Sequence, residues 1–212
     1  MLEHQVKTVE IYNQFADQYL EKFLTFDLYN DTFQQFVDLL PDDSSLLELG
    51  CGPGNVIKYL NGLRPDFTFT GIDLAPEMIR KAKELNPEAI FEVNNFLNYK
   101  TSTQPYEAVV AAFCLPYISL EDLPIFFENL SLVTRKNGYV YISCMEGLPQ
   151  KSGFEKTSFT GDQEIFMYYH QKETLEYYFK KNGLLIINTF EKNYPEVDGS
   201  FTVDLIYIAK KM

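Results

Sequence analysis

The chain has 212 residues, and 30 acidic against 18 basic side chains give it a formal net charge of −12 at pH 7. This balance, without a dense Lys/Arg cluster, argues against nucleic acid as substrate or partner, because phosphate contacts supply most non-specific affinity. Two histidines and no Cys/His cluster argue against zinc, and we expect no metal. The sequence shows no membrane-spanning run and no leader, so we expect one cytoplasmic α/β domain over residues 1–212 with no membrane partner. It gives no indication of oligomeric state.

Residues 1–40 are predicted to form a helical cap. Apolar residues recur at threes and fours in one helix and again in a second, which Pro41 ends. The first helix has Val9, Tyr12, Ala16, Tyr19, Leu20 and Phe23 on one face, and the second has Phe33, Phe36, Val37 and Leu40. His4 is expected on a frayed terminus. One interpretation is an amphipathic pair that covers a sheet edge.

A short apolar run at residues 45–49 predicts a buried strand, and three alternate glycines, Gly50, Gly52 and Gly54, follow it directly. Helical spacing resumes at Asn55. Glycine permits backbone angles closed to other residues and lets a ligand approach the main chain. Strand, glycine loop and helix therefore predict the start of a nucleotide-binding unit. A dinucleotide fingerprint needs its third glycine at position 55, so a nicotinamide-dependent oxidoreductase is the less favoured alternative.

The run from Glu48 to Gly54 closely resembles motif I of class I S-adenosyl-L-methionine (SAM)-dependent methyltransferases. It is most similar to small-molecule methyltransferase domains of types 11 and 25. Residues 12–19 resemble the Tyr-x-x-x-Ala-x-x-Tyr opening of many such enzymes, in which this helix folds over the cofactor as a lid. The resemblance implies SAM as cofactor. It also implies cofactor contacts from Tyr12, Tyr19, Glu48, Gly50, Cys51, Gly52 and Gly54.

The second predicted strand, residues 67–73, ends in Asp73, 19 positions beyond Gly54. This spacing fits a carboxylate that accepts hydrogen bonds from both ribose hydroxyls. A helix N-cap is the alternative role, but Pro76 favours a separate helix start. Residues 71–79 also resemble the second motif of the family, which implies that Leu74 and Met78 pack beside the adenine.

The third predicted strand, residues 89–93, leads to Asn95 and Phe96, where the family usually has Gly-Asp. The Asn95 carbonyl oxygen can still accept from the adenine amino group, and the Phe96 N–H is the expected partner of a ring nitrogen. The fourth strand, residues 106–112, is unbroken and apolar. It opens onto Phe113 and Cys114, in a loop that resembles the one facing the sulfonium methyl in small-molecule methyltransferases.

After a fifth strand at residues 139–144, the stretch 145–170 is predicted to be an insertion on the substrate side. Its first part, residues 145–163, is expected to be a loop, and residues 164–170 an extra strand. Alternation would place Phe166, Tyr168 and His170 on one face. Tyr168 and His170 are the candidate catalytic residues, with His170 as general base. A structural histidine is the alternative.

A helix ending at Asn182-Gly183 and strands at 184–190 and 201–209 complete the chain. The predicted fold is α/β and Rossmann-like: a seven-stranded, mostly parallel sheet with an antiparallel last strand, helices on both faces and an N-terminal helical lid. The resemblance predicts transfer of the SAM methyl group to a small, aromatic or apolar acceptor by in-line displacement, giving S-adenosylhomocysteine (SAH). A SAM-binding regulatory or scaffold protein is the main alternative, because every strong motif concerns the cofactor.

Overall fold

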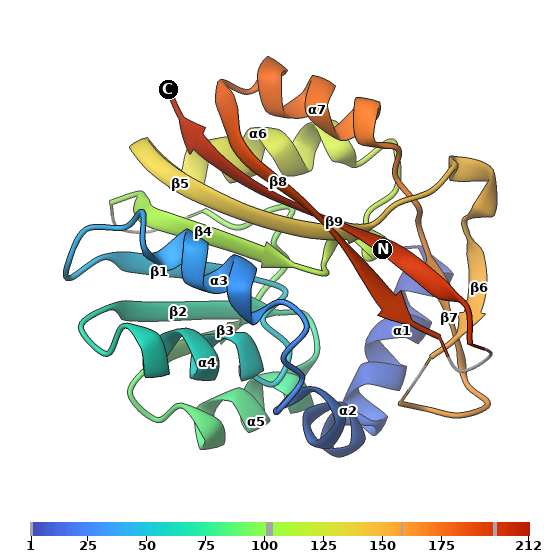
Figure 1. Ribbon diagram of the computed structural model, residues 1–212. Coiled ribbons are helices and arrows are strands. Elements are labelled where there is room, and N and C mark those ends of the chain that lie inside the picture. The colour runs from blue at the N-terminus through green and yellow to red at the C-terminus, as the bar shows by residue number, and fades with distance from the viewer. Residues whose placement is uncertain (1, 101–103, 158, 197–198) are drawn as a thin grey trace.

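A twisted seven-stranded sheet runs through the protein, and helices cover both of its faces (Figure 1). The computed structural model describes residues 2–100, 104–157, 159–196 and 199–212. The sheet has the order β3-β2-β1-β4-β5-β9-β8, in which β9 alone runs antiparallel to its neighbours. The predicted Rossmann-like fold with an antiparallel last strand is therefore confirmed. Its strands are β1 (Ser45–Leu49), β2 (Thr68–Asp73), β3 (Ile90–Val93), β4 (Tyr106–Ala112), β5 (Thr134–Met145), β8 (Leu184–Pro195) and β9 (Phe201–Lys211).

Two apolar layers hold the helices on the sheet. Because successive strand residues point to opposite faces, Leu47 and Val109 pack with α6 and α7, whereas Leu46 and Val110 pack with α3, α4 and α5. The central strands β1 and β4 are thus buried on both sides, as their unbroken apolar sequences require. The helices are α1 (Glu3–Gln14), α2 (Ala16–Phe23), α3 (Asn30–Val37), α4 (Asn55–Leu63), α5 (Pro76–Leu85), α6 (Leu123–Val133) and α7 (Lys172–Lys181).

The N-terminal cap differs from the prediction. Residues 3–23 form two helices, because the backbone breaks at Phe15 (φ −111°, ψ 25°). The break lets α1 pack against both α5 and β7, while α2 packs on α5. His4 lies inside α1, which begins at Glu3, so its expected place on a frayed terminus is wrong.

The insertion also differs from the prediction. The expected loop contains a 3₁₀ turn η2 (Pro149–Lys151) and a strand β6 (Gly153–Lys156), which pairs with β7 (Glu164–Met167) in a separate two-stranded sheet. The predicted strand over 164–170 is too long. After Met167 the Tyr168 amide donates to the Pro116 carbonyl oxygen (2.8 Å) of the 3₁₀ turn η1 (Leu115–Tyr117), which takes the chain out of the hairpin.

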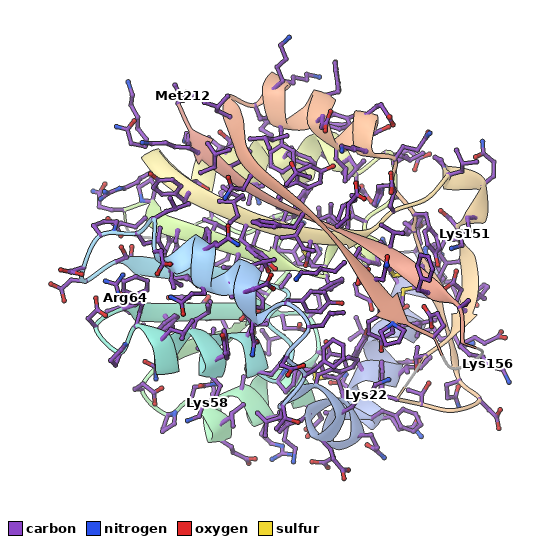
Figure 2. All side chains as sticks on the ribbon, in the orientation of Figure 1. Lys22, Lys58, Arg64, Lys151, Lys156 and Met212 are labelled. Atoms are coloured by element: carbon purple, nitrogen blue, oxygen red, sulfur yellow. The ribbon has the colours of Figure 1, made fainter. Side chains whose placement is uncertain are left out.

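Smaller differences concern element ends. Strand β5 starts at Thr134, before the predicted position 139, and Asn137 within it has a φ of +63°. No helix in the described part of the chain is both long and apolar enough to cross a membrane. Figure 2 shows the labelled Lys58 and Lys151 on opposite sides of the molecule, so these basic side chains do not gather in one patch.

Candidate cofactor and acceptor site

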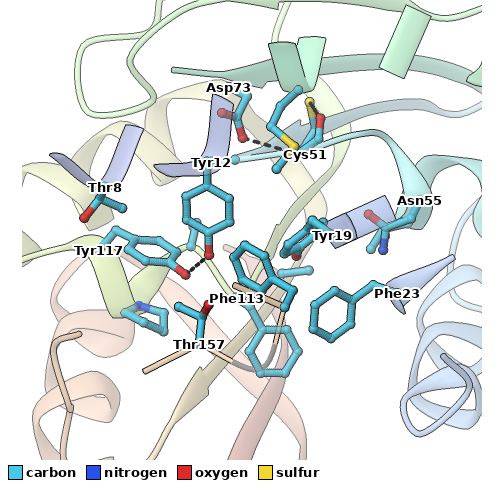
Figure 3. Close-up of a pocket in the computed structure, with 18 of the residues that line it drawn as sticks. Thr8, Tyr12, Tyr19, Phe23, Cys51, Asn55, Asp73, Phe113, Tyr117 and Thr157 are labelled. Carbon is cyan, nitrogen blue, oxygen red and sulfur yellow. Dashed lines mark hydrogen bonds between the residues drawn. The ribbon is translucent and has the colours of Figure 1, made fainter. Parts of the chain in front are cut away.

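A cavity of about 430 Å³ lies at the carboxyl ends of β1, β2 and β4, where strand order reverses. The N-terminal helices and the β6–β7 hairpin also contribute to its lining, and Figure 3 shows part of it. The predicted cofactor residues that line it are Tyr12, Tyr19, Glu48, Gly50, Cys51, Gly52, Asp73, Leu74, Met78, Asn95, Phe96, Phe113 and Cys114. The fold thus gathers residues from five segments of the sequence at one site.

The glycine loop is open to the cavity at one position. Gly50, Gly52 and Gly54 all have positive φ, at +67°, +50° and +78°. A Cβ at Gly52 would meet only Tyr19, at 3.7 Å, so the main chain is accessible there. Gly54 lies outside the cavity lining. Its Cβ would lie 2.7 Å from Asn86 Nδ2 and 3.2 Å from Ala82 Cβ, so Gly54 serves the packing of α4 on α5.

Asp73 ends β2 and holds two neighbouring segments. Its Oδ2 accepts a hydrogen bond from the Gly52 N–H (2.9 Å), and Oδ1 accepts one from the Ala75 N–H (2.8 Å). Burial raises the pKa of Asp73, and these backbone donors act in the opposite direction. The carboxyl group therefore orders both the glycine loop and the turn into α5, and a second lone pair on each oxygen can still accept a hydrogen bond.

Glu48, in β1, is 1% exposed and lines the same cavity. Its Oε2 atom has no hydrogen-bond partner among the described residues. Burial and the negative charge of Asp73 raise the pKa of Glu48, while the Ile57 backbone N–H lowers it. Buried carboxyl oxygens are nearly always hydrogen-bonded, so Glu48 indicates a donor that comes from the cavity.

Aromatic side chains of the N-terminal helices cover the glycine loop. The hydroxyl groups of Tyr12 and Tyr117 are hydrogen-bonded (Figure 3), and the rings of Tyr12 and Tyr19 meet edge to face with centroids 5.6 Å apart. Phe159 lies against both rings. A small apolar cluster that includes Ala16 and Met78 attaches these helices to the domain. The predicted lid segment therefore lies over the cavity.

Phe113 marks the loop after β4. It has a φ of +55°, which is costly for a residue with a bulky side chain. Its amide donates to the Ser143 carbonyl oxygen (3.2 Å), which holds this conformation, and its ring lies 4.9 Å from that of Tyr29. Backbone strain of this kind concentrates at functional sites.

The two predicted catalytic residues do not share a face. Tyr168 lines the cavity, but His170 is completely buried outside the lining, where its Nε2 lies 3.0 Å from the Leu115 carbonyl oxygen. Burial lowers the pKa of His170. This placement opposes the predicted role of His170 as general base. Strand β7 ends at Met167, so the alternation that would place His170 on the same face as Tyr168 does not reach it. The histidine in the cavity lining is His4, whose Nε2 is 2.8 Å from the Tyr168 hydroxyl oxygen.

Sequence reasoning also missed a buried acid. The Tyr29 hydroxyl donates to Asp204 Oδ2 at 2.6 Å, and both residues line the cavity. Burial, with a smaller effect from Glu196, raises the pKa of Asp204 to about 7. The available signal was an acid inside the otherwise apolar run of β9. In the described part of the chain, no group of three or more His, Cys, Asp or Glu residues could hold a metal ion.

Comparison with known proteins agrees with this geometry. Residues 46–138 match the model of a methyltransferase domain family. The chain is 35% identical over 83 residues to trans-aconitate 2-methyltransferase from Escherichia coli and 29% identical over 94 residues to the enzyme of that name from Variovorax paradoxus. These matches cover 39% and 43% of this chain but 31% and 36% of the relatives, so the chain spans about a third of their length.

Solved structures are similar over more of the chain. A SAM-dependent methyltransferase from Methanosarcina mazei is 18% identical, with a TM-score of 0.72, over 83% of this chain and 96% of that one. Geranyl diphosphate C-methyltransferase from Streptomyces coelicolor, solved with Mg²⁺, geranyl diphosphate and SAH, is 14% identical, with a TM-score of 0.71, over 100% and 99%. At these identities the likeness shows the fold. That fold is the one of class I SAM-dependent methyltransferases, and the match to the methyltransferase domain model falls within it, at residues 46–138.

Proposed function

We propose that the protein is an enzyme that transfers the SAM methyl group to a small acceptor. The observation that carries this proposal is Glu48 Oε2, a buried carboxyl oxygen at the cavity without a donor. SAM has an ammonium group on its methionine part, which can supply the missing donor. The open main chain at Gly52 leaves room for that part of the molecule beside Glu48.

The other cofactor contacts follow from the same placement. Asp73 would accept from the ribose hydroxyls, and Leu74 and Met78 would pack beside the adenine. Asn95 Oδ1 already accepts the Leu97 N–H at 2.9 Å, and its second lone pair is available to the adenine amino group.

When bound, SAM supplies a methyl group on a sulfonium, which a nucleophile can take by in-line displacement. The protein then has to align the acceptor and exclude water. The rings of Tyr12, Tyr19 and Phe113 serve both needs, since they line the cavity and present aromatic faces that stabilise a cation. His170 lies outside the cavity lining, whereas His4 and Asp204 are among the titratable residues within it.

The acceptor we propose is small and aromatic or apolar. Beyond the cofactor residues the lining is rich in rings, which include Tyr117, Phe159, Phe166 and Tyr168. The acids Glu155, Glu196 and Asp204 also line the cavity. Among the described lining residues, Lys156 is the only lysine or arginine. The negative charge of the lining disfavours anionic acceptors. Trans-aconitate and geranyl diphosphate, which appear in the names of two similar proteins, are both anionic.

Calorimetry of SAM binding to wild type, Asp73→Ala and Asp73→Asn tests the proposal. We expect Asp73→Ala to lose about 2–4 kcal/mol of binding free energy, on the scale of hydrogen bonds to charged groups. The SAM affinity of Asp73→Asn should fall between those of wild type and Asp73→Ala, because one side-chain oxygen remains as an acceptor. Thermal unfolding without SAM controls for the two backbone hydrogen bonds that Asp73 also makes.

Equal affinity of all three proteins for SAM would show that Asp73 does not contact the cofactor. The absence of SAM binding to wild type would overturn the proposal. SAH release across a panel of small hydroxyl, amine and thiol acceptors tests transfer itself. Tight SAM binding without SAH release from any of them would favour the regulatory alternative.

A further inference from the structure

A buried carboxyl group lies in the cavity wall far from the glycine loop in sequence. Asp204 is 2% exposed and sits on β9 opposite Met145 of β5, which also lines the cavity. The Tyr29 hydroxyl, 2.6 Å from Oδ2, fixes the orientation of the carboxyl group. None of the proposed SAM contacts uses this group, so its place in the lining needs another explanation.

Among the residues that the structure describes, no cation forms an ion pair with Asp204. Lys192 is opposite Asp204 in the β8–β9 register, but its Nζ binds Asp31 at 2.7 and 2.8 Å. The titratable groups in the described ranges that interact with Asp204 are neutral or acidic: Tyr29, Tyr141, Cys144, Tyr169 and Glu196. A buried carboxylate without a counter-charge is unfavourable, which is why the pKa of Asp204 rises to about 7.

Aromatic rings surround the same part of the cavity. The Tyr29 ring lies 4.9 Å from Phe113 and 5.7 Å from Phe26, and Phe26 lies 5.7 Å from Tyr194. All four rings line the cavity. Aromatic faces attract organic cations, and more strongly where water is excluded. A carboxylate beside such rings has the composition of a site for an ammonium group on an apolar body.

We propose that Asp204, with the rings of Tyr29, Phe113 and Tyr194, binds the ammonium form of a primary or secondary amine acceptor. Before transfer the ammonium gives one proton to the Asp204 carboxylate. The lone pair of the neutral amine then forms the bond to the SAM methyl carbon as the C–S bond breaks and SAH leaves. This inference rests on the proposed function, since it identifies the acceptor of the same cavity. It makes Asp204 a specificity-determining residue. The Asp204 carboxylate attracts the positive charge of a protonated amine. It offers no such attraction to a neutral alcohol of the same shape, and it repels a ligand that is itself a carboxylate.

Calorimetric titration of the SAH-loaded protein at pH 8 provides the test. The probes are 2-phenylethylamine, 2-phenylethanol and phenylacetate, with n-hexylamine and 1-hexanol as an aliphatic pair. In wild type we expect at least one amine to bind tenfold or more tightly than its alcohol, and phenylacetate to bind most weakly. Asp204→Asn should weaken amine binding at least tenfold while the alcohol stays within twofold. SAH affinity should not change.

Glu191→Gln is the matched control, because it removes an exposed carboxylate from β8 without touching the cavity lining. Its amine affinity should equal that of wild type. The proposal is overturned if neither amine binds more tightly than its alcohol, or if Asp204→Asn leaves amine binding unchanged. It is also overturned if an alcohol binds more tightly at pH 6 than at pH 8, because Asp204 would then act as a neutral donor.

The same titrations distinguish failure of the proposed methyl transfer from failure of the ammonium site. If SAH itself does not bind wild type, the proposed function fails. If SAH binds and Asp73→Ala weakens it, but amines show no preference, the proposed function stands and the ammonium site alone is wrong.

Discussion

The imidazole of His4 is hydrogen-bonded to the phenol of Tyr168, with Nε2 and Oη 2.8 Å apart across 164 positions of sequence. The His4 ring also lies 4.6 Å from Phe166 in β7. These contacts join α1 to the end of the β6–β7 hairpin, and all three side chains line the cavity. The N-terminal helix and the insertion therefore meet over the site as one cover.

Tyr168→Phe removes this hydrogen bond and keeps the ring. We expect SAH to dissociate several-fold faster, since a hydrogen bond of about 1 kcal/mol holding the cover closed corresponds to roughly fivefold. Stopped-flow measurement of SAH release checks this. Tyr177→Phe, on an exposed ring of α7, is the control. Reduced turnover with unchanged SAH release would instead support the catalytic role that the sequence predicts for Tyr168.

Gly52→Ala and Gly183→Ala form a matched pair. Both positions have positive φ, +50° and +70°, so each alanine should cost about 1–2 kcal/mol of unfolding free energy. A Cβ at Gly183 meets nothing within 4 Å, and it lies outside the cavity lining. We expect only Gly52→Ala to weaken SAM binding, by tenfold or more, in calorimetry. Equal SAM affinity in the two variants would contradict a close approach of SAM to Gly52.

Hydrogen exchange tests whether the N-terminal helices move. They attach to α5 through a small cluster around Ala16, Ala75 and Met78, separate from the two main apolar layers. Local opening should therefore be frequent without ligand. We expect SAH to slow exchange of the amides from Tyr12 to Tyr19 at least tenfold, with α6 as an unaffected internal reference. Identical exchange with and without SAH would make these helices a fixed part of the scaffold.

Asp204→Asn should stabilise the protein in a pH-dependent way. The pKa of Asp204 in the folded state, about 7, lies above its ordinary value. The stability of wild type is therefore greatest when this group is neutral and falls as the pH rises through about 7. We expect the stability advantage of the variant to be roughly 2–3 kcal/mol larger at pH 8 than at pH 5. Urea denaturation of both proteins at the two pH values measures this difference in unfolding free energy. A difference that does not change with pH would show that burial leaves the pKa of Asp204 at its ordinary value.

The sequence by itself determined the nucleotide-binding half of this protein. The short apolar runs at residues 45–49 and 106–112, and the left-handed backbone that Gly50 and Gly52 allow, are local properties, so a short window of residues specifies them. The parallel strands then bring Asp73 beside Gly52, because consecutive βα units deliver their carboxyl ends to one edge.

Only the tertiary structure decided the acceptor half. Tyr29 and Asp204 are 175 positions apart, and no periodicity relates one to the other. Alternation favoured His170, but the hydrogen bond from the Tyr168 amide to Pro116 takes the chain out of the hairpin, and His170 turns into the core. His4 reaches the cavity because the break at Phe15 lets α1 pack against β7. Contacts of this kind depend on how whole elements pack, which local residue patterns do not encode.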